Sequence, residues 1–207
     1  GVSPRDAGPA GEWDNGNGSL MRVIPLALWH RGSDAELLRD AFAQSAVTHG
    51  HMRSKLCCAL YCLWVQRLLL ADDDEQRSAA WGAAVAALRD LIHDDDAAQE
   101  ALEMHIRPDQ PATGAGSGYV VDSLRSARMI FDHVLARNEA ATSSVERGLR
   151  SAVALGHDTD TTACVLGGLL GAAFGADALP ERWRTGLRGM AIVEPMLAQL
   201  VERGPTT

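Results

Sequence analysis

Basic residues are scarce in this chain of 207 residues. Lysine and arginine together number 19, against 27 aspartates and glutamates, which gives a formal net charge of −8. Generic binding to a nucleic-acid backbone needs basic side chains gathered on one face, so this deficit argues against a nucleic-acid partner. It still allows an anionic nucleotide ligand if metal ions stand between the ligand and acidic side chains.

Long apolar runs are also missing. The best candidate for a membrane span, residues 161–176, is uncharged but short and rich in glycine. No signal peptide is visible near the start of the sequence. We therefore expect no membrane association and a cytoplasmic location.

Cysteines are few, and they lack the spacing of a metal site or a redox motif. No CxxC pattern occurs, and no cysteine and histidine stand at metal-ligand spacing. Three of the four cysteines crowd one apolar segment, LCCALYCLWV. We expect buried thiols in a reducing compartment at Cys57, Cys58, Cys62 and Cys164.

The alternating pattern of β-strands is absent too, and helical patterns take its place. Hydrophobic residues make up 46% of the chain, which is typical of a globular protein. The sequence predicts an all-α fold in a single domain over residues 1–207, with capping boxes at Ser33–Glu36 and Ser143–Glu146. The expected helices cover residues 19–30, 33–47, 49–70, 71–91, 93–105, 119–137, 143–155 and 161–176, with one or two more in 180–204.

Glycines recur every four residues in one predicted helix, at Gly167, Gly171 and Gly175. A glycine inside a helix costs roughly 1 kcal/mol relative to alanine. Close approach of a neighbouring helix backbone along this face would compensate for that cost. We therefore expect this helix to be the central and most buried one.

The segment GHDTDTTA, residues 156–163, concentrates oxygen-bearing side chains just before that helix. In a helix Asp158 and Asp160 would point about 200° apart, whereas in an extended or turn segment they lie on the same side. Capping explains one acid or threonine but not the whole cluster. Carboxylates and hydroxyls are ligands suited to Mg²⁺, Mn²⁺ or Ca²⁺. Composition alone supports a metal site and a solvated helix start equally.

Two glycine-rich turns also precede predicted helices. NGNGSLMR, residues 15–22, exposes backbone N–H groups as a phosphate-binding loop does, although such turns are common. GSGYVVDSLRSA, residues 116–127, places Tyr119 at the junction. Its ring could stack on a base or pack in the core, and by itself the pattern favours core packing.

The remaining polar clusters have simpler interpretations. The histidine in THGH, residues 48–51, is by itself more typical of a structural residue than of a catalyst. The aspartate runs at 72–74 and 94–96 lie at predicted helix starts, where acidic side chains favour the helix dipole. We interpret both runs as solvated caps.

Together these segments resemble the successive sequence blocks of the ADP-ribosylglycohydrolase family, which includes the dinitrogenase reductase-activating glycohydrolases. The matching blocks are NGNGSLMRVIPLAL, THGH, GSGYVVDSLRSA and GHDTDTTACVLGGLLGAAFGADALPERW. The resemblance implies an orthogonal multi-helix fold with a centre of two divalent cations, usually Mg²⁺ or Mn²⁺. It also implies hydrolysis of an N- or O-glycosidic bond at C1″ of ADP-ribose.

The resemblance assigns roles to the residues that fall on the family's motifs. The carboxy-terminal metal ligands match Asp158, Asp160 and Thr161. The loop that holds the diphosphate and distal ribose matches Gly16, Asn17 and Gly18, and the positions that continue it match Ser19 and Met21. The histidine beside the cleft matches His49, and the turn against the adenosine matches Gly118 and Tyr119. The implied partner is ADP-ribose or an ADP-ribosylated protein.

One part of the family pattern has no counterpart in the chain. The family carries an early G-D-A-x-G turn and then a Thr/Ser-Asp-Asp block, which supplies the other metal ligands and the general base. The runs at 72–74 and 94–96 lack the hydroxyl residue and follow the NGNG segment, which is the wrong order. We therefore expect an amino-terminally truncated domain whose catalytic base lies outside this sequence and which is inactive alone.

Two other interpretations stand beside the hydrolase. One is a catalytically inactive module of the same fold that binds ADP-ribose or another partner. The other is a plain helical scaffold in which the motifs serve only as caps and turns. The sequence leaves open the oligomeric state and the ADP-ribosyl linkage that is cleaved.

Overall fold

The protein, described by a computed structural model, consists of helices joined by turns and loops. The structure describes residues 1–137 and 139–203, and within these ranges no strand forms. The all-α prediction is therefore confirmed. The α-helices are α1 (Gly18–Met21), α2 (Ile24–Trp29), α3 (Asp34–Ala46), α4 (Met52–Leu69), α5 (Asp74–Leu91), α6 (Asp96–Glu100), α7 (Val120–Leu135), α8 (Ala141–Ala154), α9 (Thr159–Phe174), α10 (Glu181–Gly186) and α11 (Met190–Arg203). Three further segments are the 3₁₀ turns η1 (Pro4–Asp6) and η3 (Ala176–Ala178) and the π-helical η2 (Ala101–Ile106).

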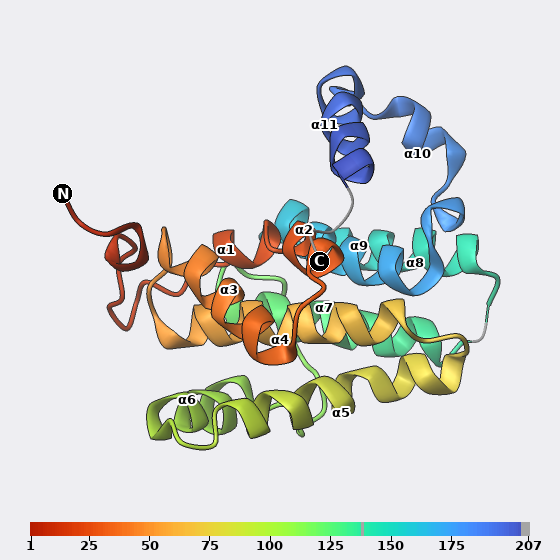
Figure 1. Cartoon of the computed structure of the whole chain (residues 1–207). Coiled ribbons are helices and arrows are strands. Elements are labelled where there is room, and N and C mark those ends of the chain that lie inside the picture. Colours follow the sequence, from red (N-terminus) through yellow and green to blue (C-terminus); the bar gives the residue numbers. More distant parts are fainter. Residues whose placement is uncertain (138, 204–207) are drawn as a thin grey trace.

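Helix α4 lies at the centre of the body and packs against α2, α3, α5, α7 and α9 (Figure 1). Its residues from Leu56 to Val65 are all buried. Trp64 meets Trp81 of α5 and Phe131 of α7 edge to face, with ring centroids 4.9 and 5.2 Å away. A helix that is apolar on every side must be covered on every side, and this explains its position. The prediction that the glycine-rich helix, α9, is the most buried one is therefore wrong.

The glycines of α9 also serve a different purpose from the predicted one. A side-chain carbon at Gly171 would touch nothing within 4 Å, and one at Gly167 would meet only a leucine methyl group, at 3.5 Å. Gly175 ends the helix with a φ of 79°. The close contact falls instead at Gly168, where such a carbon would lie 2.1 Å from the Tyr61 hydroxyl oxygen. Glycine is therefore required at Gly168 by the Tyr61 side chain of α4, and not by a helix backbone along the predicted face.

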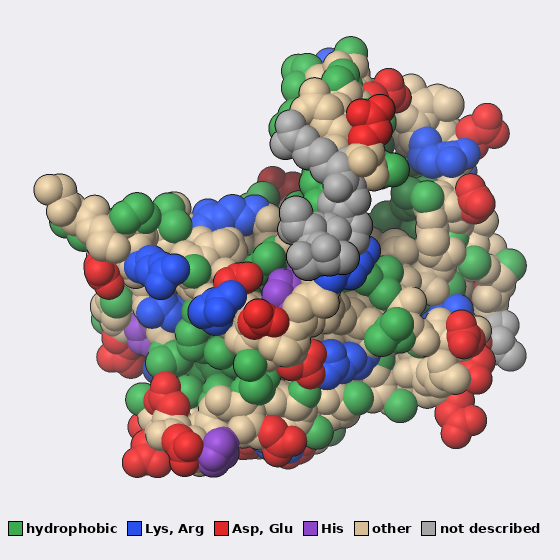
Figure 2. Space-filling view, in the orientation of Figure 1, with side chains coloured by type: hydrophobic (Ala, Val, Ile, Leu, Met, Phe, Trp, Pro, Cys, Tyr) green, Lys and Arg blue, Asp and Glu red, His purple; other side chains and the backbone are tan. Residues whose placement is uncertain are grey.

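Helix starts follow the capping chemistry of the sequence at three places. Ser33 and Glu36 form the predicted capping box of α3. The Asp73 carboxylate accepts a hydrogen bond from the Gln76 N–H at 2.8 Å, at the start of α5. Asp95 accepts one from the Ala98 N–H at 3.0 Å, at the start of α6. Each aspartate run therefore supplies a helix cap, and acidic side chains gather on the surface around α6 (Figure 2).

The capping box predicted at Ser143–Glu146 is wrong. Helix α8 begins at Ala141, so Ser143 lies inside the first turn and cannot occupy the N-cap position. Ala140 occupies that position and makes no side-chain capping bond. Alanine is the strongest helix former, so the consecutive alanines extend the helix upstream of the serine.

The cysteines divide into two groups. Cys57, Cys58 and Cys62 of α4 are buried as predicted, and desolvation raises the pKa of each thiol. Cys164 is exposed, so the prediction is wrong there. It lies one turn into α9, and its thiol donates to the Met21 carbonyl oxygen at 3.4 Å, where the short helix α1 covers it only in part.

Helices α10 and α11 project from the body above α8 and α9 (Figures 1 and 2). They account for the range 180–204 predicted to hold one or two helices, and Gly204 lies outside the described residues. In the described ranges no helix is both long enough and apolar enough to cross a lipid bilayer. Apolar side chains are exposed along α11 at Ile192, Val193, Met196, Leu197, Leu200 and Val201.

Candidate functional site

The candidate site forms where segments that are distant in the sequence meet. We call residues 15–18 the NGNG loop and residues 116–119 the GSGY turn. The Asn17 N–H donates to the Gly118 carbonyl oxygen at 3.1 Å, and the Val120 N–H donates to the Asn15 carbonyl oxygen at 2.9 Å. Gly16 and Tyr119 form an antiparallel bridge between them. The backbone therefore holds the two glycine-rich segments side by side.

A third segment, the DTD turn (residues 156–161), joins the GSGY turn. The Asp158 N–H donates to the Gly116 carbonyl oxygen at 2.9 Å. Gly156 and His157 both have left-handed backbones, with φ of 79° and 55°. A left-handed histidine costs on the order of 1–3 kcal/mol, and such strain clusters at functional sites. The strained turn places Asp158 just before α9 and Asp160 in its first turn.

Asn17 links all three segments through its side chain. Its amide nitrogen donates to the Ser123 hydroxyl oxygen at 2.8 Å and to Asp158 Oδ2 at 2.7 Å. The Ser123 hydroxyl in turn donates to the Ser117 carbonyl oxygen at 2.8 Å. Hydrogen bonding from Asn17 is the main cause that lowers the pKa of Asp158, with further contributions from Thr161 and Asp160. The arrangement keeps Asp158 ionised and fixed in direction.

The DTD turn offers hard oxygen donors for a cation. Asp160 is exposed, and its side chain is close enough to Asp158 to influence that carboxyl group. Thr161 is buried, and its hydroxyl lies 3.9 Å from the Met21 sulfur, a weak acceptor. Two neighbouring carboxylates beside a weakly bonded hydroxyl fit a divalent cation such as Mg²⁺ or Mn²⁺. Residues 1–137 and 139–203 contain no group of three or more His, Cys, Asp and Glu side chains placed to hold a metal, so the fit is to part of a ligand set.

His49 lies against the NGNG loop at Gly16 and Gly18. A side-chain carbon at Gly16 would lie 3.2 Å from His49 Nε2, and one at Gly18 would lie 3.0 Å from Cε1. Glycine at both positions leaves room for the imidazole ring beside the loop. Desolvation, and then the charge of Arg22, lower the pKa of His49. The histidine is therefore neutral at neutral pH and lies at the candidate site.

Tyr119 is not a core residue, because 37% of its surface is exposed. It borders an open hollow of about 500 Å³. The hollow carries polar and cationic groups from η2, the following loop and α7: His105, Arg107, Asp122 and Arg125. Burial of part of the ring raises the pKa of the phenol. A partly exposed aromatic ring at the edge of a polar hollow suits a planar ligand group.

Of the two positions that continue the NGNG loop, Ser19 lies in the core and Met21 contacts the DTD turn. Ser19 is fully buried, and its hydroxyl oxygen lies 3.0 Å from the Ser45 hydroxyl oxygen and accepts from the Cys58 thiol at 3.4 Å. The Met21 sulfur lies 3.9 Å from the Thr161 hydroxyl oxygen. The structure thus gathers Gly16, Asn17, Gly18, His49, Gly118, Tyr119 and Asp158 directly, while Ser19 lies beneath the loop.

Ser123 belongs to the site and escaped the sequence prediction. It lies within the block that contains Tyr119, yet its hydroxyl bridges Asn17 and the GSGY turn. A serine inside a predicted helix carries no local signal that separates such a bridge from a solvent-facing hydroxyl. The contact depends on the distant Asn17.

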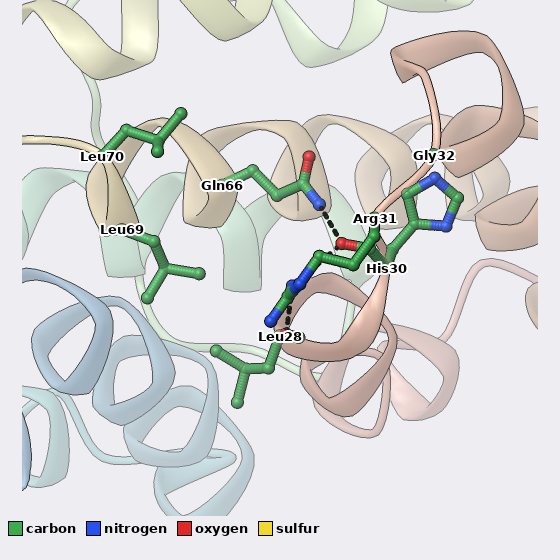
Figure 3. A pocket seen from close by; sticks show the side chains of 7 residues that line it. All are labelled: Leu28, His30, Arg31, Gly32, Gln66, Leu69 and Leu70. Carbon is green, nitrogen blue, oxygen red and sulfur yellow. Dashed lines mark hydrogen bonds between the residues drawn. The ribbon is translucent and has the colours of Figure 1, made fainter. Parts of the chain in front are cut away.

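A second hollow lies apart from these segments, between the end of α2 and the end of α4 (Figure 3). It measures about 470 Å³. Gln66 donates a hydrogen bond to the His30 carbonyl oxygen at 3.1 Å, and Arg31 donates to the Leu28 carbonyl oxygen at 2.9 Å. These polar groups already have partners within the chain, so this hollow offers less ligand chemistry than the candidate site.

The fold and the site define a class: an all-helical protein with a glycine loop, an aromatic turn and a carboxylate turn around one asparagine. The ADP-ribosylglycohydrolase family model matches residues 1–206. The chain therefore belongs to the ADP-ribosylglycohydrolase family.

Relatives of known name support the assignment. The chain is 28% identical over 179 residues to the ADP-ribosyl-[dinitrogen reductase] glycohydrolase of Rhodospirillum rubrum, covering 84% of this chain and 51% of the relative. It is 27% identical over 193 residues to the ADP-ribosylarginine hydrolase Tri1 of Pseudomonas putida (strain GB-1), covering 92% and 47%. It is 38% identical over 64 residues to human ADP-ribosylhydrolase ARH3, covering 31% and 17%. The chain spans about half the length of the first two relatives.

Proposed function

We propose that the chain takes part in metal-dependent hydrolysis of the glycosidic bond at C1″ of ADP-ribose, on an ADP-ribosylated protein or a small molecule. The observation that carries the proposal is the meeting of the NGNG loop, the GSGY turn and the DTD turn at the Asn17 side chain. The names of the relatives make ADP-ribosyl-arginine the first substrate to assay.

We assign the ligand groups by the chemistry of each segment. Gly16, Asn17 and Gly18 are assigned to the diphosphate and distal ribose, because a glycine-rich turn before a helix exposes backbone N–H groups to an anion. The Tyr119 ring is assigned to the adenosine, since a base can stack on an exposed aromatic face. The assignment places the ligand across the bridge between Gly16 and Tyr119, with its distal ribose toward Asp158.

Asp158, Asp160 and Thr161 are proposed to hold part of a centre of two Mg²⁺ or Mn²⁺ ions. When bound, such ions lower the pKa of water and stabilise negative charge near the reacting carbon. This chain contributes oxygen ligands for the cations. Asn17 orients the carboxylate of Asp158, and the start of α9 positions Asp160 and Thr161. Three donors fill only part of the coordination of two cations. We therefore propose that the general base is not among these residues and that this chain alone does not turn over substrate.

Titration of the chain with Mn²⁺ by calorimetry tests the ligand assignment. Asp160→Asn is expected to weaken Mn²⁺ binding by roughly 10–100-fold, because even residues that only support metal ligands have effects of this size. Asp94→Asn is the matched control, since it removes an exposed carboxylate in the turn before α6. Equal Mn²⁺ affinity in the wild type and Asp160→Asn would remove Asp160 from the ligand set.

An assay of ADP-ribosyl-arginine hydrolysis with Mn²⁺ tests the activity. No turnover is expected from this chain alone, whereas turnover is expected when an amino-terminal segment of a relative is supplied with it. Turnover by the chain alone contradicts the proposal that its ligand set is partial. Binding of ADP-ribose without turnover in every combination would favour the inactive binding module instead.

A further inference from the structure

Hydrogen bonds hold the backbone around His49 in place. Its N–H donates to the Ser45 carbonyl oxygen at 2.7 Å, and its own carbonyl oxygen accepts from the Ser45 hydroxyl at 2.9 Å. The next residue, Gly50, donates its N–H to the Pro9 carbonyl oxygen at 2.8 Å. The ring of His49 therefore leaves a well-anchored turn, and its Nε2 edge faces the NGNG loop.

The opposite edge of the ring, Nδ1, belongs to a chain of hydrogen bonds that starts at Arg22. One terminal nitrogen of Arg22 donates to the Gln44 carbonyl oxygen at 2.9 Å and to the Thr48 hydroxyl oxygen at 2.7 Å. Its Nε donates to Gln44 Oε1 at 3.2 Å. The Thr48 hydroxyl oxygen then lies 2.8 Å from His49 Nδ1. Arg22 directly follows α1 and Thr48 lies two residues after α3, so the ends of two helices position the relay.

The direction of this relay selects one form of the imidazole. Arginine only donates, so the Thr48 oxygen accepts from Arg22. Among the hydrogen bonds of residues 1–137 and 139–203, the acceptor within reach of the Thr48 hydroxyl proton is His49 Nδ1. A proton on Nδ1 would instead leave the hydroxyl proton without that partner. The arrangement in which the Thr48 hydroxyl proton has a partner within the chain has Nδ1 as acceptor, and in that arrangement the imidazole proton is on Nε2.

We propose that Arg22 and Thr48 are positioning residues that hold His49 in its neutral Nε2–H tautomer, with that N–H directed at the NGNG loop. In this form the imidazole presents a single donor to an anionic oxygen of a ligand in the loop. The Nδ1–H tautomer would present a lone pair there and repel the same oxygen. The nature of the ligand rests on the proposed function, whereas the tautomer does not.

The charge state of the ring agrees with this role. Desolvation and the neighbouring Arg22 both lower the pKa of His49, so the ring stays neutral above the ordinary range of histidine titration. A neutral ring has two tautomers, and the relay decides between them. Arg22 therefore contributes twice, through the hydrogen bond to Thr48 and through its charge.

Long-range ¹H–¹⁵N correlation spectra of the ¹⁵N-labelled chain measure the tautomer directly. Above the range of histidine titration, the wild type is expected to show a protonated Nε2 and a hydrogen-bonded, unprotonated Nδ1 at His49. His49→Gln assigns the signals. Thr48→Val, which keeps the shape but removes the hydroxyl, is expected to give an average of both tautomers. Thr48→Ser is expected to restore the wild-type pattern, and Thr142→Val, on the exposed surface of α8, is expected to leave it unchanged.

A protonated Nδ1 in the wild type would overturn the proposal, and this result needs no variant to fold. An unchanged pattern in Thr48→Val would overturn the role of Thr48. Calorimetry with ADP-ribose gives the second readout: Thr48→Val is expected to lose roughly two- to tenfold in affinity, the value of one hydrogen bond, and Thr48→Ser is expected to regain it. If the wild type shows the Nε2–H tautomer but binds no ADP-ribose, the proposed function fails while the tautomer assignment stands.

Discussion

Among single residues, Asn17 combines several tasks in one side chain. Its backbone N–H binds the GSGY turn, and its amide nitrogen binds both Ser123 and Asp158. Only 7% of the residue is exposed. An aspartate at this position would put a second carboxylate against Asp158, and an aliphatic residue would leave two polar groups without a donor. The position therefore requires an uncharged donor.

Asn17→Ala is expected to destabilise the protein by about 1–3 kcal/mol, because it leaves partly buried acceptors without a partner. Urea unfolding in the presence of a chelator measures this effect without any contribution from bound metal. Ser123→Ala, which removes one acceptor and keeps the bond to Asp158, is the matched control and is expected to lie at the lower end of that range. Equal stability of Asn17→Ala and the wild type would show that the asparagine does not tie the segments together.

The residues of the site could be predicted only where a local motif marks them. Asn17, Tyr119 and Asp158 lie in glycine-rich or acidic segments that stand out from their surroundings. Arg22, Thr48 and Ser123 also lie in marked segments, but the motifs do not give their roles, because those come from contacts with residues far along the chain. Ser19 likewise lies in a marked segment but is buried in the core.

Among the elements, α9 depends on one glycine contact with α4. The Tyr61 hydroxyl that would meet a side chain at Gly168 is buried and donates to the Val165 carbonyl oxygen at 2.9 Å, so it cannot retreat. Gly168→Ala is expected to destabilise the protein by about 1–3 kcal/mol through overpacking. Gly171→Ala is expected to stabilise it by up to about 1 kcal/mol, since nothing lies near that position.

Thermal or urea unfolding of the two alanine variants separates these effects, because both place the same residue in the same helix. A loss of stability in both variants would mean that glycine is required along the whole face of α9. The sequence predicts the presence and the length of α9 correctly. Its contacts depend on where Tyr61 lies, which the pattern of glycines does not contain.

Helices α3 and α4 are joined by an ion pair that depends on pH. Arg67 of α4 donates to both carboxylate oxygens of Asp34, the first residue of α3. Hydrogen bonding from Arg67 is the main cause that lowers the pKa of Asp34 below its ordinary value of 3.8. A lowered carboxyl pKa adds stability above the unfolded value and loses it as pH falls through the folded value.

Asp34→Asn is therefore expected to reduce the free energy of unfolding at about pH 6, and the difference from the wild type is expected to shrink toward about pH 3. Urea unfolding at a series of pH values measures this convergence. Asp74→Asn is the control, because it breaks an exposed pair with Arg77 within α5 and is expected to have little effect. A difference that stays constant down to about pH 3 would show that Asp34 acts through packing or capping rather than through its charge.

For the whole molecule, the helical class and most helices could be read from the sequence, and the arrangement could not. Helix boundaries followed from capping residues such as Ser33 and Asp73. The central position of α4 could not be predicted, because α9 is the more apolar of the two helices and the sequence therefore favours α9 for the centre. Residues 181–203 divide into two helices at a turn that contains Gly189, with a φ of 84°, and both helices project from the body (Figure 1).

The hydrogen bond between Asn17 and Asp158 joins residues 141 positions apart, and this distance has a consequence during synthesis. A ribosome adds about 5–20 residues per second, so the NGNG loop emerges on the order of ten seconds before its partner turn. Until α9 has left the exit tunnel, Asn17 has no carboxylate to bind and the candidate site lacks the DTD turn. A ligand that needs the complete site therefore cannot stabilise shorter nascent chains. It can bind and stabilise a chain only after α9 has been synthesised.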